Sequence, residues 1–296
     1  MVQFTNNANF CWINSALTSF IWALHNITGL PNQDLPLPTP SQGLEAALLS
    51  WSNLDLPYVV SANAFIEVYL EFLGGDPVER RNRAVQESPE TFFRDIGPGW
   101  THDALPLATA TCLPRLRTFT LGQNCNCPED GPAFANEQQH PEPLIDIQFP
   151  HQGFQAEIDL KFRRHELGRC PQCDVACRLE INSAFSTPSQ IVVVAVNRIN
   201  FISRNRPEII RDEIEVPEIV RFPTLQGPKN YTLISAIQHR GGLNPGEFRH
   251  FVSYLKFQNG FALVDDAKEI KLFGPNVIKS CHVFVFVETD DDMQYA

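Results

Sequence analysis

Long apolar runs are absent from this sequence. No stretch reaches the about 18 consecutive apolar residues that a membrane-spanning helix needs. No Lys or Arg precedes the first apolar segment, so the N-terminus does not have the basic region of a secretory signal peptide. We therefore expect a soluble protein that is not secreted and that acts in the cytoplasm or the nucleus.

Basic residues are also scarce. The 296 residues include 23 Lys and Arg against 34 Asp and Glu, which gives a net charge of −11 at pH 7. This deficit argues against a nucleic-acid groove and is compatible with a basic protein partner. The eight cysteines are even in number, but without a secretory signal they are better interpreted as thiols, metal ligands or a nucleophile than as disulfides.

Secondary-structure patterns divide the chain into a helical part and a later part rich in strands. After Cys11 the apolar residues recur at helical spacing and predict an amphipathic helix that ends near Gly29, and helical patterns resume at 44–51 and 62–72. The length and the hydrophobic fraction of 43% fit one α+β domain, with a helical N-terminal lobe followed by an antiparallel sheet. Apolar runs bounded by Pro- and Gly-rich turns predict strands at 144–149, 156–162, 191–196, 251–257 and 282–287.

Cys11 is the candidate nucleophile. It begins a predicted helix, whose first-turn N–H groups and dipole stabilise a thiolate and lower the pKa of the thiol. Acyl transfer also needs donors directed at a developing oxyanion, and the side-chain amide of Asn6 can act there beside the backbone N–H of Cys11. This segment taken alone is equally compatible with a core thiol at a helix start, since cysteine is among the most buried residue types.

A thiol nucleophile needs a histidine base and a third group that holds the imidazole in the right tautomer. His250 begins one predicted strand and Asp265 ends the next, with a turn at 258–260 between them. A hairpin through this turn brings the two side chains together. Asp266 adjoins the orienting carboxylate and is a second candidate for its role. A single histidine is more often structural, so the prediction rests on the combination.

Two close cysteine pairs predict a structural zinc site, because Zn²⁺ is commonly held by four thiolates in a closed tetrahedral arrangement. The predicted strands 144–149 and 156–162 lie between the pairs, so a long hairpin would return the chain to its start and bring the sulfurs together. Thiols without metal are the alternative, and Cys177 and His140 are reserve ligands. The predicted ligands are Cys125, Cys127, Cys170 and Cys173.

Residues 8–15 resemble the cysteine box of the ubiquitin-specific proteases, usually written G-N-T-C-Y-x-N-S, with Cys11 as its nucleophile. The departures at Ala8, Phe10 and Trp12 remove no chemical group that the reaction requires. The resemblance therefore favours a catalytic thiol over a core cysteine.

Three further segments resemble parts of the same family. The segment 239–266 is similar to the histidine box G-H-Y-x-x-Y followed by W-x-x-F-D-D, which implies His250 as base and Asp265 as orienting carboxylate. Residues 86–93 resemble the Q-Q-D-A-x-E-F-F helix, and the cysteine pairs resemble the family's zinc-tipped fingers. Because these segments occur in the family's order over nearly the whole chain, they imply a papain-like fold with thumb, palm and fingers.

The resemblance implies a single catalytic domain over 1–296. The helical thumb would occupy about 1–110, fingers and palm about 111–220, and the rest of the palm about 221–296. The implied activity is that of a thiol-dependent isopeptidase, a deubiquitinase that cleaves after the C-terminal glycine of ubiquitin. It would act as a monomer, without a catalytic cofactor.

Departures from the family pattern bear on the substrate. Ser88 and Thr91 stand where the family has acidic residues that help hold the arginines of ubiquitin's C-terminal tail, and Arg249 replaces the glycine before the base. The neighbouring Glu87 and Glu90 could substitute if the helix rotated. The same chemistry on SUMO or another ubiquitin-like modifier is therefore an alternative. An inactive module that binds a ubiquitin-like protein is a third reading, against which the retained triad argues.

Overall fold

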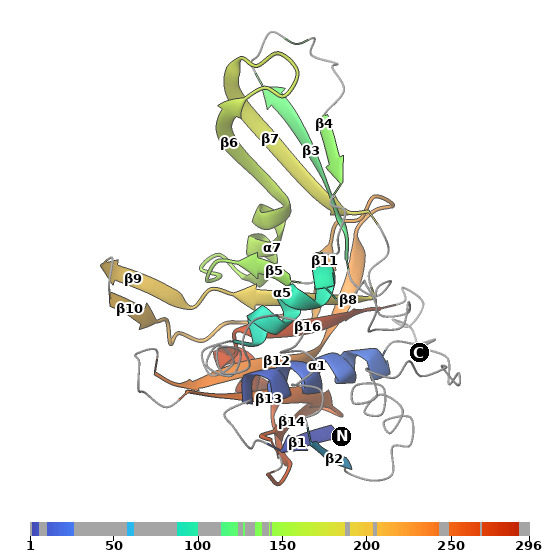
Figure 1. Cartoon of the computed structure of the whole chain (residues 1–296), viewed down its shortest axis with the longest axis vertical. Coiled ribbons are helices and arrows are strands. Elements are labelled where there is room, and N and C mark those ends of the chain that lie inside the picture. The colour runs from blue at the N-terminus through green and yellow to red at the C-terminus, as the bar shows by residue number, and fades with distance from the viewer. Residues whose placement is uncertain are drawn as a thin grey trace.

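A large sheet forms the centre of the molecule, and a smaller four-stranded sheet projects from it (Figure 1). Both belong to a computed structural model of the whole chain. The residues that the structure describes are 2–5, 11–26, 58–61, 88–99, 114–123, 127, 134–137, 142, 144–186, 190–203, 206–242, 249–266 and 268–289.

The central sheet has eight strands in the order β15-β14-β13-β12-β16-β8-β5, with β11 also paired to β12. Its neighbouring strands are antiparallel except for β5 and β8, which run parallel. The sheet confirms the strands predicted near 144–149, 191–196, 251–257 and 282–287. Its strands are β5 (Leu144–Ile147), β8 (Ile191–Val196), β11 (Ile219–Phe222), β12 (Lys229–Gly241), β13 (Arg249–Phe257), β14 (Gly260–Val264), β15 (Lys271–Phe273) and β16 (Val283–Glu288).

The middle of this sheet is covered on both faces. Every residue of β8 is buried, as are the first five residues of β16. A strand with apolar side chains on both faces needs such cover, which is why these two segments have uninterrupted apolar runs. Helix α1 (Cys11–Asn26) packs on β12, β13 and β16. On the core side, the Phe154 ring meets Phe284 at 5.4 Å between centroids.

Residues 154–162 form a helix, α7 (Phe154–Phe162), so the strand predicted at 156–162 is wrong. The segment looks like a strand because apolar and polar residues partly alternate, but its largest apolar residues recur at helical spacing. The buried residues Phe154, Ile158 and Phe162 are four positions apart and share one helical face, which packs into the core. The tertiary contacts of these large side chains decide the conformation.

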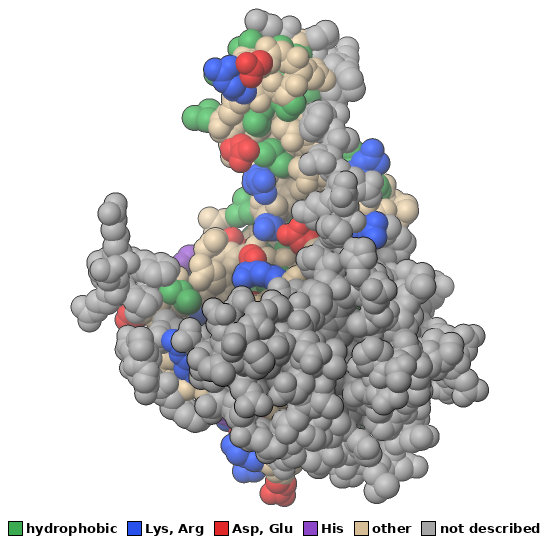
Figure 2. Space-filling view, in the orientation of Figure 1, with side chains coloured by type: hydrophobic (Ala, Val, Ile, Leu, Met, Phe, Trp, Pro, Cys, Tyr) green, Lys and Arg blue, Asp and Glu red, His purple; other side chains and the backbone are tan. Residues whose placement is uncertain are grey.

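The projecting sheet is antiparallel and has the order β4-β3-β7-β6. It replaces the long hairpin predicted between the cysteine pairs, because β5 joins the central sheet and α7 follows it. Hydrophobic side chains are exposed along this projection, with Leu121 and Leu167 among them (Figure 2). The strands are β3 (Leu116–Gln123), β4 (Phe134–Glu137), β6 (Arg163–Arg169) and β7 (Ala176–Phe185).

The described N-terminal part contains α1, α5 (Pro89–Gly99) and a parallel pair of strands, β1 (Val2–Thr5) and β2 (Tyr58–Ser61). Helix α1 confirms the helix predicted after Cys11, although it ends at Asn26. The helices predicted at 44–51 and 62–72 lie outside the described residues. Of the helices that the structure describes, none has the length and apolarity needed to cross a membrane. The remaining elements are the hairpin of β9 (Ile199–Ser203) and β10 (Arg206–Ile209) and the 3-10 helix η1 (Pro275–Ser280).

Candidate active site

Helix α1 is buried along most of its length, which fixes the position of its first residue. Its apolar residues Ile13, Leu17 and Phe20 are fully buried. Polar residues on its other faces, such as Asn14 and Ser19, are buried as well. A helix enclosed in this way must satisfy its polar groups internally.

Four buried serines form a chain of hydrogen bonds that pairs some of these polar groups. The Ser15 hydroxyl donates to the carbonyl oxygen of Cys11 at 2.7 Å, and the Ser253 hydroxyl donates to the carbonyl of Ser15 at 2.8 Å. The Ser19 hydroxyl donates to Ser253 Oγ at 3.3 Å, and the Ser235 hydroxyl donates to Ser19 Oγ at 2.8 Å. The chain joins the start of α1 to β12 and β13. Sequence analysis missed it, although two serines four positions apart on an apolar helix are a signal for it.

Cys11 lies against the start of β13. Its Sγ is 4.0 Å from the carbonyl oxygen of Arg249, and the backbone of Phe251 also forms a hydrogen bond with the thiol. Burial raises the pKa of the Cys11 thiol above its ordinary value, and the backbone hydrogen bonds only partly oppose this. The expected lowering of the thiol pKa by the helix terminus is therefore wrong for this arrangement. A positive group beside the sulfur is needed to form the thiolate.

His250, one residue after Arg249, forms a hydrogen bond with Asp265 at 2.6 Å between Nε2 and Oδ1. Both side chains are buried, and the hairpin of β13 and β14 brings them together as predicted. Nε2 faces the carboxylate, so Nδ1 is the ring nitrogen that remains for proton exchange. The His250–Asp265 pair therefore lies one residue along β13 from Arg249, whose carbonyl is next to the Cys11 thiol.

Asp265 also meets two cations. Lys268 Nζ lies 3.1 Å from each carboxylate oxygen, and Arg240 Nη1 lies 3.9 Å from Oδ2. Burial favours the neutral acid, but the hydrogen bonds from His250 and Lys268 outweigh it and lower the pKa of Asp265. The carboxylate is therefore held ionised over a wider pH range. Lys268 was missed at the sequence level, since a lysine shortly after two aspartates carries no specific signal.

Asp266 contacts a different partner. Its Oδ1 accepts a hydrogen bond from Asn14 Nδ2 at 2.9 Å, and its backbone has a φ of 49°. This positive φ turns the chain away from β14 and directs the two neighbouring carboxylates to different partners. Asn6, the predicted oxyanion donor, lies outside the described residues.

A second cluster of candidate residues lies at the β6–β7 turn of the small sheet. Cys127 Sγ is 3.6 Å from Cys170 Sγ, and both sulfurs lie within 4.8 Å of that of Cys173. Sulfurs that bind one zinc ion at about 2.3 Å each lie about 3.8 Å apart, whereas a disulfide bond is about 2.05 Å long. These three cysteines fit a metal ion. Cys125 and His140 lie outside the described residues.

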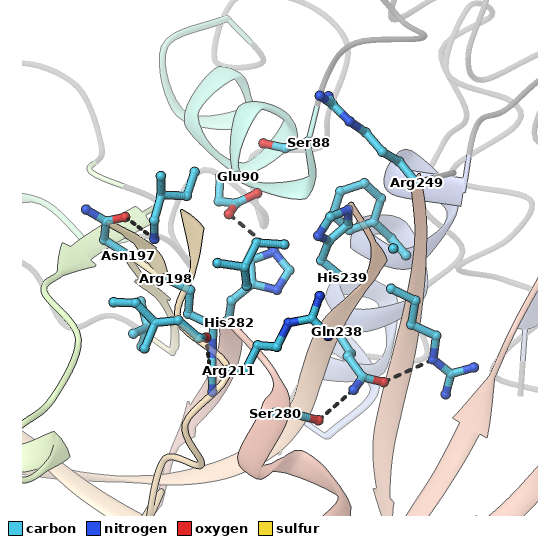
Figure 3. Close-up of a pocket in the computed structure, with 17 residues that line it drawn as sticks. Ser88, Glu90, Asn197, Arg198, Arg211, Gln238, His239, Arg249, Ser280 and His282 are labelled. Atoms are coloured by element: carbon cyan, nitrogen blue, oxygen red, sulfur yellow. Dashed lines mark hydrogen bonds and ion pairs between the residues drawn. The ribbon is translucent and has the colours of Figure 1, made fainter. Parts of the chain in front are cut away.

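A cavity of about 570 Å³ lies beside Cys11, between α5 and the ends of β8, β12 and β13 (Figure 3). Arg249 and Phe251, which both contact the thiol, line it. Glu90 and His282 also line it, with 3.3 Å between Oε1 and Nε2. Burial opposes ionisation of Glu90, but His282 outweighs it and lowers the pKa of Glu90 to about 2. Glu90 and Ser88 thus both line the cavity, and the carboxylate of Glu90 is paired with His282.

Comparison with solved structures gives this domain the fold of a ubiquitin-specific protease. No family model matches the sequence, and no curated protein matches it. Solved structures do match, at 12% sequence identity, which shows the fold alone. One is the SAGA module of Ubp8, Sgf11, Sus1 and Sgf73, a deubiquitinase (DUB) module bound to ubiquitin aldehyde, with a TM-score of 0.68 over 98% of this chain and 70% of the other.

Two further structures of this module are also similar. The yeast module with an Sgf73 mutant has a TM-score of 0.63, and a Ubp8 mutant module bound to monoubiquitin has a TM-score of 0.64. Each match covers 98% of this chain and 69% of the other chain. The domain is therefore similar in fold to a ubiquitin protease.

Proposed function

We propose that this chain is a thiol-dependent isopeptidase that cleaves after the C-terminal glycine of ubiquitin or a ubiquitin-like modifier. The observation that carries the proposal is the 2.6 Å bond between His250 and Asp265 one residue from Arg249, whose carbonyl contacts the Cys11 thiol. A nucleophile, a base and an orienting acid in this order form the triad of a cysteine protease. The fold of the similar structures supports the same class.

In this mechanism His250 takes the proton of the Cys11 thiol, and the thiolate attacks the carbonyl carbon of the isopeptide bond. The C–N bond then breaks, and His250 returns its proton to the departing lysine amine. Water, deprotonated by His250, attacks the resulting thioester and releases the modifier with a free carboxylate. Asp265 holds the imidazole and stabilises its charged form. Formation of imidazolium supplies the positive charge that a buried thiolate needs.

The oxyanion that forms during attack requires hydrogen-bond donors. We assign the backbone N–H of Cys11 to this role, together with Asn6, whose amide precedes the nucleophile in the sequence. Asp266 acts differently in this proposal. Its bond to Asn14 holds α1 against the end of β14 and so positions Cys11 rather than the base.

A structural zinc ion at the tip of the small sheet completes the proposal. Cys127, Cys170 and Cys173 would hold it, with Cys125 as the fourth thiolate. Such an ion would hold the strands together and would supply no chemistry to the reaction. The thumb at about 1–110, the fingers and palm at about 111–220 and the palm at about 221–296 would then be parts of one domain, acting as a monomer in the cytoplasm or nucleus.

Ubiquitin is the first substrate candidate, because two of the similar modules are bound to ubiquitin or its aldehyde. SUMO is the second, because of one specific observation. Ser88 replaces an acid in the resemblance, and Glu90 is committed to His282. Neither Ser88 nor Glu90 therefore offers a free carboxylate to the arginines of ubiquitin's tail.

The proposal is tested by incubating the protein with ubiquitin and with SUMO that carry C-terminal electrophiles. We expect an adduct on Cys11 by intact mass and peptide mapping. Cys11→Ala should lose the adduct and keep the far-UV circular dichroism spectrum. Cys177→Ala, which removes another partly buried thiol, should react like the natural chain. Labelling that persists in Cys11→Ala would refute the mechanism.

A further inference from the structure

The cavity beside Cys11 carries an excess of positive charge, although the chain as a whole has a net charge of −11. Of the described residues that line it, one has a carboxylate, Glu90, and four have guanidinium groups. We call it the arginine cavity. Its arginines are Arg198, Arg211, Arg240 and Arg249.

Two of these arginines have structural partners. Arg198 donates to backbone carbonyls, including those of Cys281 and Lys279, and is mostly buried. Arg240 donates to Gln238 and Tyr254 and lies near Asp265. Their side chains are held by the fold and leave no group to move toward a ligand.

Arg211 is different. It is exposed, and among the described residues no carboxylate lies within ion-pair distance of it. Figure 3 shows its side chain crossing the arginine cavity toward Gln238. The guanidinium therefore presents donors to the space that a ligand would occupy. A planar fork of this kind matches the geometry of a carboxylate, and its N–H groups can also donate to the carbonyl oxygen of an amide.

The single carboxylate of the cavity does not cancel this charge. Glu90 Oε1 is paired with His282 at 3.3 Å. The nearby His239 packs on Phe251 with 4.9 Å between ring centroids, and its buried Nε2 has no hydrogen-bond partner among the described residues. A ligand that brought an additional cation here would face the guanidinium of Arg211, and like charges at close range are costly.

The arginine cavity and the Cys11 thiol share two neighbouring residues. Arg249 and Phe251 line it and also contact the Cys11 thiol through their backbones. A peptide whose carbonyl carbon lies at Cys11 must therefore place neighbouring residues in or beside the cavity. An extended chain advances about 3.3 to 3.6 Å per residue, so these residues lie close to the scissile bond.

We propose that the arginine cavity binds a side chain with an acceptor oxygen, Asp, Glu, Asn or Gln, in the modifier's tail just before its terminal glycines. This proposal rests on the proposed isopeptidase function and specifies its substrate class. Arg211 donates to the acceptor oxygen, and the same cation repels a tail that carries arginine. The preferred modifier thus has an acidic or amide-bearing tail.

The test uses C-terminal electrophiles of ubiquitin in which the tail arginines are kept, replaced by Gln, or replaced by Glu. The rate of adduct formation on Cys11 is measured by intact mass at low and at high salt. We expect the Gln and Glu tails to react faster than the arginine tail by about tenfold or more at low salt. We expect added salt to reduce the difference for Glu more than for Gln.

A charge reversal provides the decisive comparison. Arg211→Glu should invert the order, so that the arginine tail reacts faster than the Glu tail. Lys271→Glu, an equal charge change on the exposed strand β15, should keep the order of the natural chain. Labelling with the arginine tail fastest in the natural chain would overturn the tail assignment and leave the isopeptidase proposal standing. If none of the three probes labels Cys11, both the tail assignment and the isopeptidase proposal are overturned.

Discussion

Asn14 Nδ2 donates to Asp266 Oδ1 at 2.9 Å, across 252 positions of the sequence. The bond ties the first turn of α1 to the residue that follows Asp265. Two adjacent aspartates thus have separate partners, His250 for Asp265 and Asn14 for Asp266. Residues 265 and 266 therefore hold both His250 and the start of α1.

The two acids should therefore differ when each is replaced by its amide. Asp265→Asn removes the charge that orients and stabilises the imidazolium, and we expect kcat to fall roughly 10²-fold or more. Asp266→Asn keeps a hydrogen-bond acceptor for Asn14, and we expect a decrease in kcat of no more than about tenfold. Steady-state hydrolysis of a C-terminal fluorogenic modifier measures both. Equal losses in the two variants would mean that the carboxylates share one role.

Lys268 should set the acid limit of activity. It contributes to the lowered pKa of Asp265, so Lys268→Gln should raise that pKa toward its ordinary value. Orientation of His250 is lost as the pH falls through the pKa of Asp265, and in Lys268→Gln the loss should begin at a higher pH. The dependence of kcat on pH measures the shift. Lys271→Gln, an exposed lysine on β15, should leave the profile unchanged.

Glu90 should make stability depend on acid pH. Its pKa is about 2 in the folded protein and near 4.5 when unfolded, so its stabilisation is fully present above pH 4.5. As the pH falls through about 2 the stabilisation is lost. Glu90→Gln should be less stable at neutral pH and should show a flatter dependence in this window. Urea unfolding at several pH values measures both, with the exposed Glu166→Gln as a control.

The serine chain beneath the nucleophile should be cooperative. Ser19→Ala leaves Ser235 without its acceptor and should lower the free energy of unfolding by about 1–3 kcal/mol. Once Ser19 is gone, Ser235→Ala should cost little, because its hydroxyl has already lost its acceptor. Chemical denaturation of the two single variants and the double variant gives the coupling energy. Strict additivity would indicate that the hydroxyls act independently.

The cysteine cluster should bind one zinc ion per chain. Cys173→Ser should release it, since a hydroxyl is a poor replacement for a thiolate in a structural site. Metal analysis of the purified protein and of this variant measures occupancy. The matched variant Cys177→Ala should retain the metal. Loss of zinc from Cys177→Ala instead would place that residue among the ligands.

Patterns carried by local sequence were predictable. The helical spacing after Cys11 gives α1, the apolar runs give β8 and β16, and the turn at 258–260 gives the hairpin that joins His250 to Asp265. These features depend on neighbours along the chain. The resemblance to the family's sequence boxes then implied a role for each candidate site residue.

Features set by tertiary contacts were not predictable. The helix α7 forms because three aromatic and aliphatic side chains meet the core, and this overrides an apparent strand pattern. The parallel pairing of β5 with β8 and the ion pair of Glu90 with His282 likewise join distant segments. The raised pKa of Cys11 reflects burial, which no single segment reveals.

The position of β16 has a consequence for biosynthesis. This strand is the last that the structure describes, yet it lies between β12 and β8 inside the sheet. A nascent chain on the ribosome exposes Cys11 first and completes the sheet only when β16 has been translated. Because 238 positions separate Cys11 from Arg249, Cys11 meets the start of β13 late. In a growing polypeptide the place between β12 and β8 therefore stays unfilled until β16 is inserted.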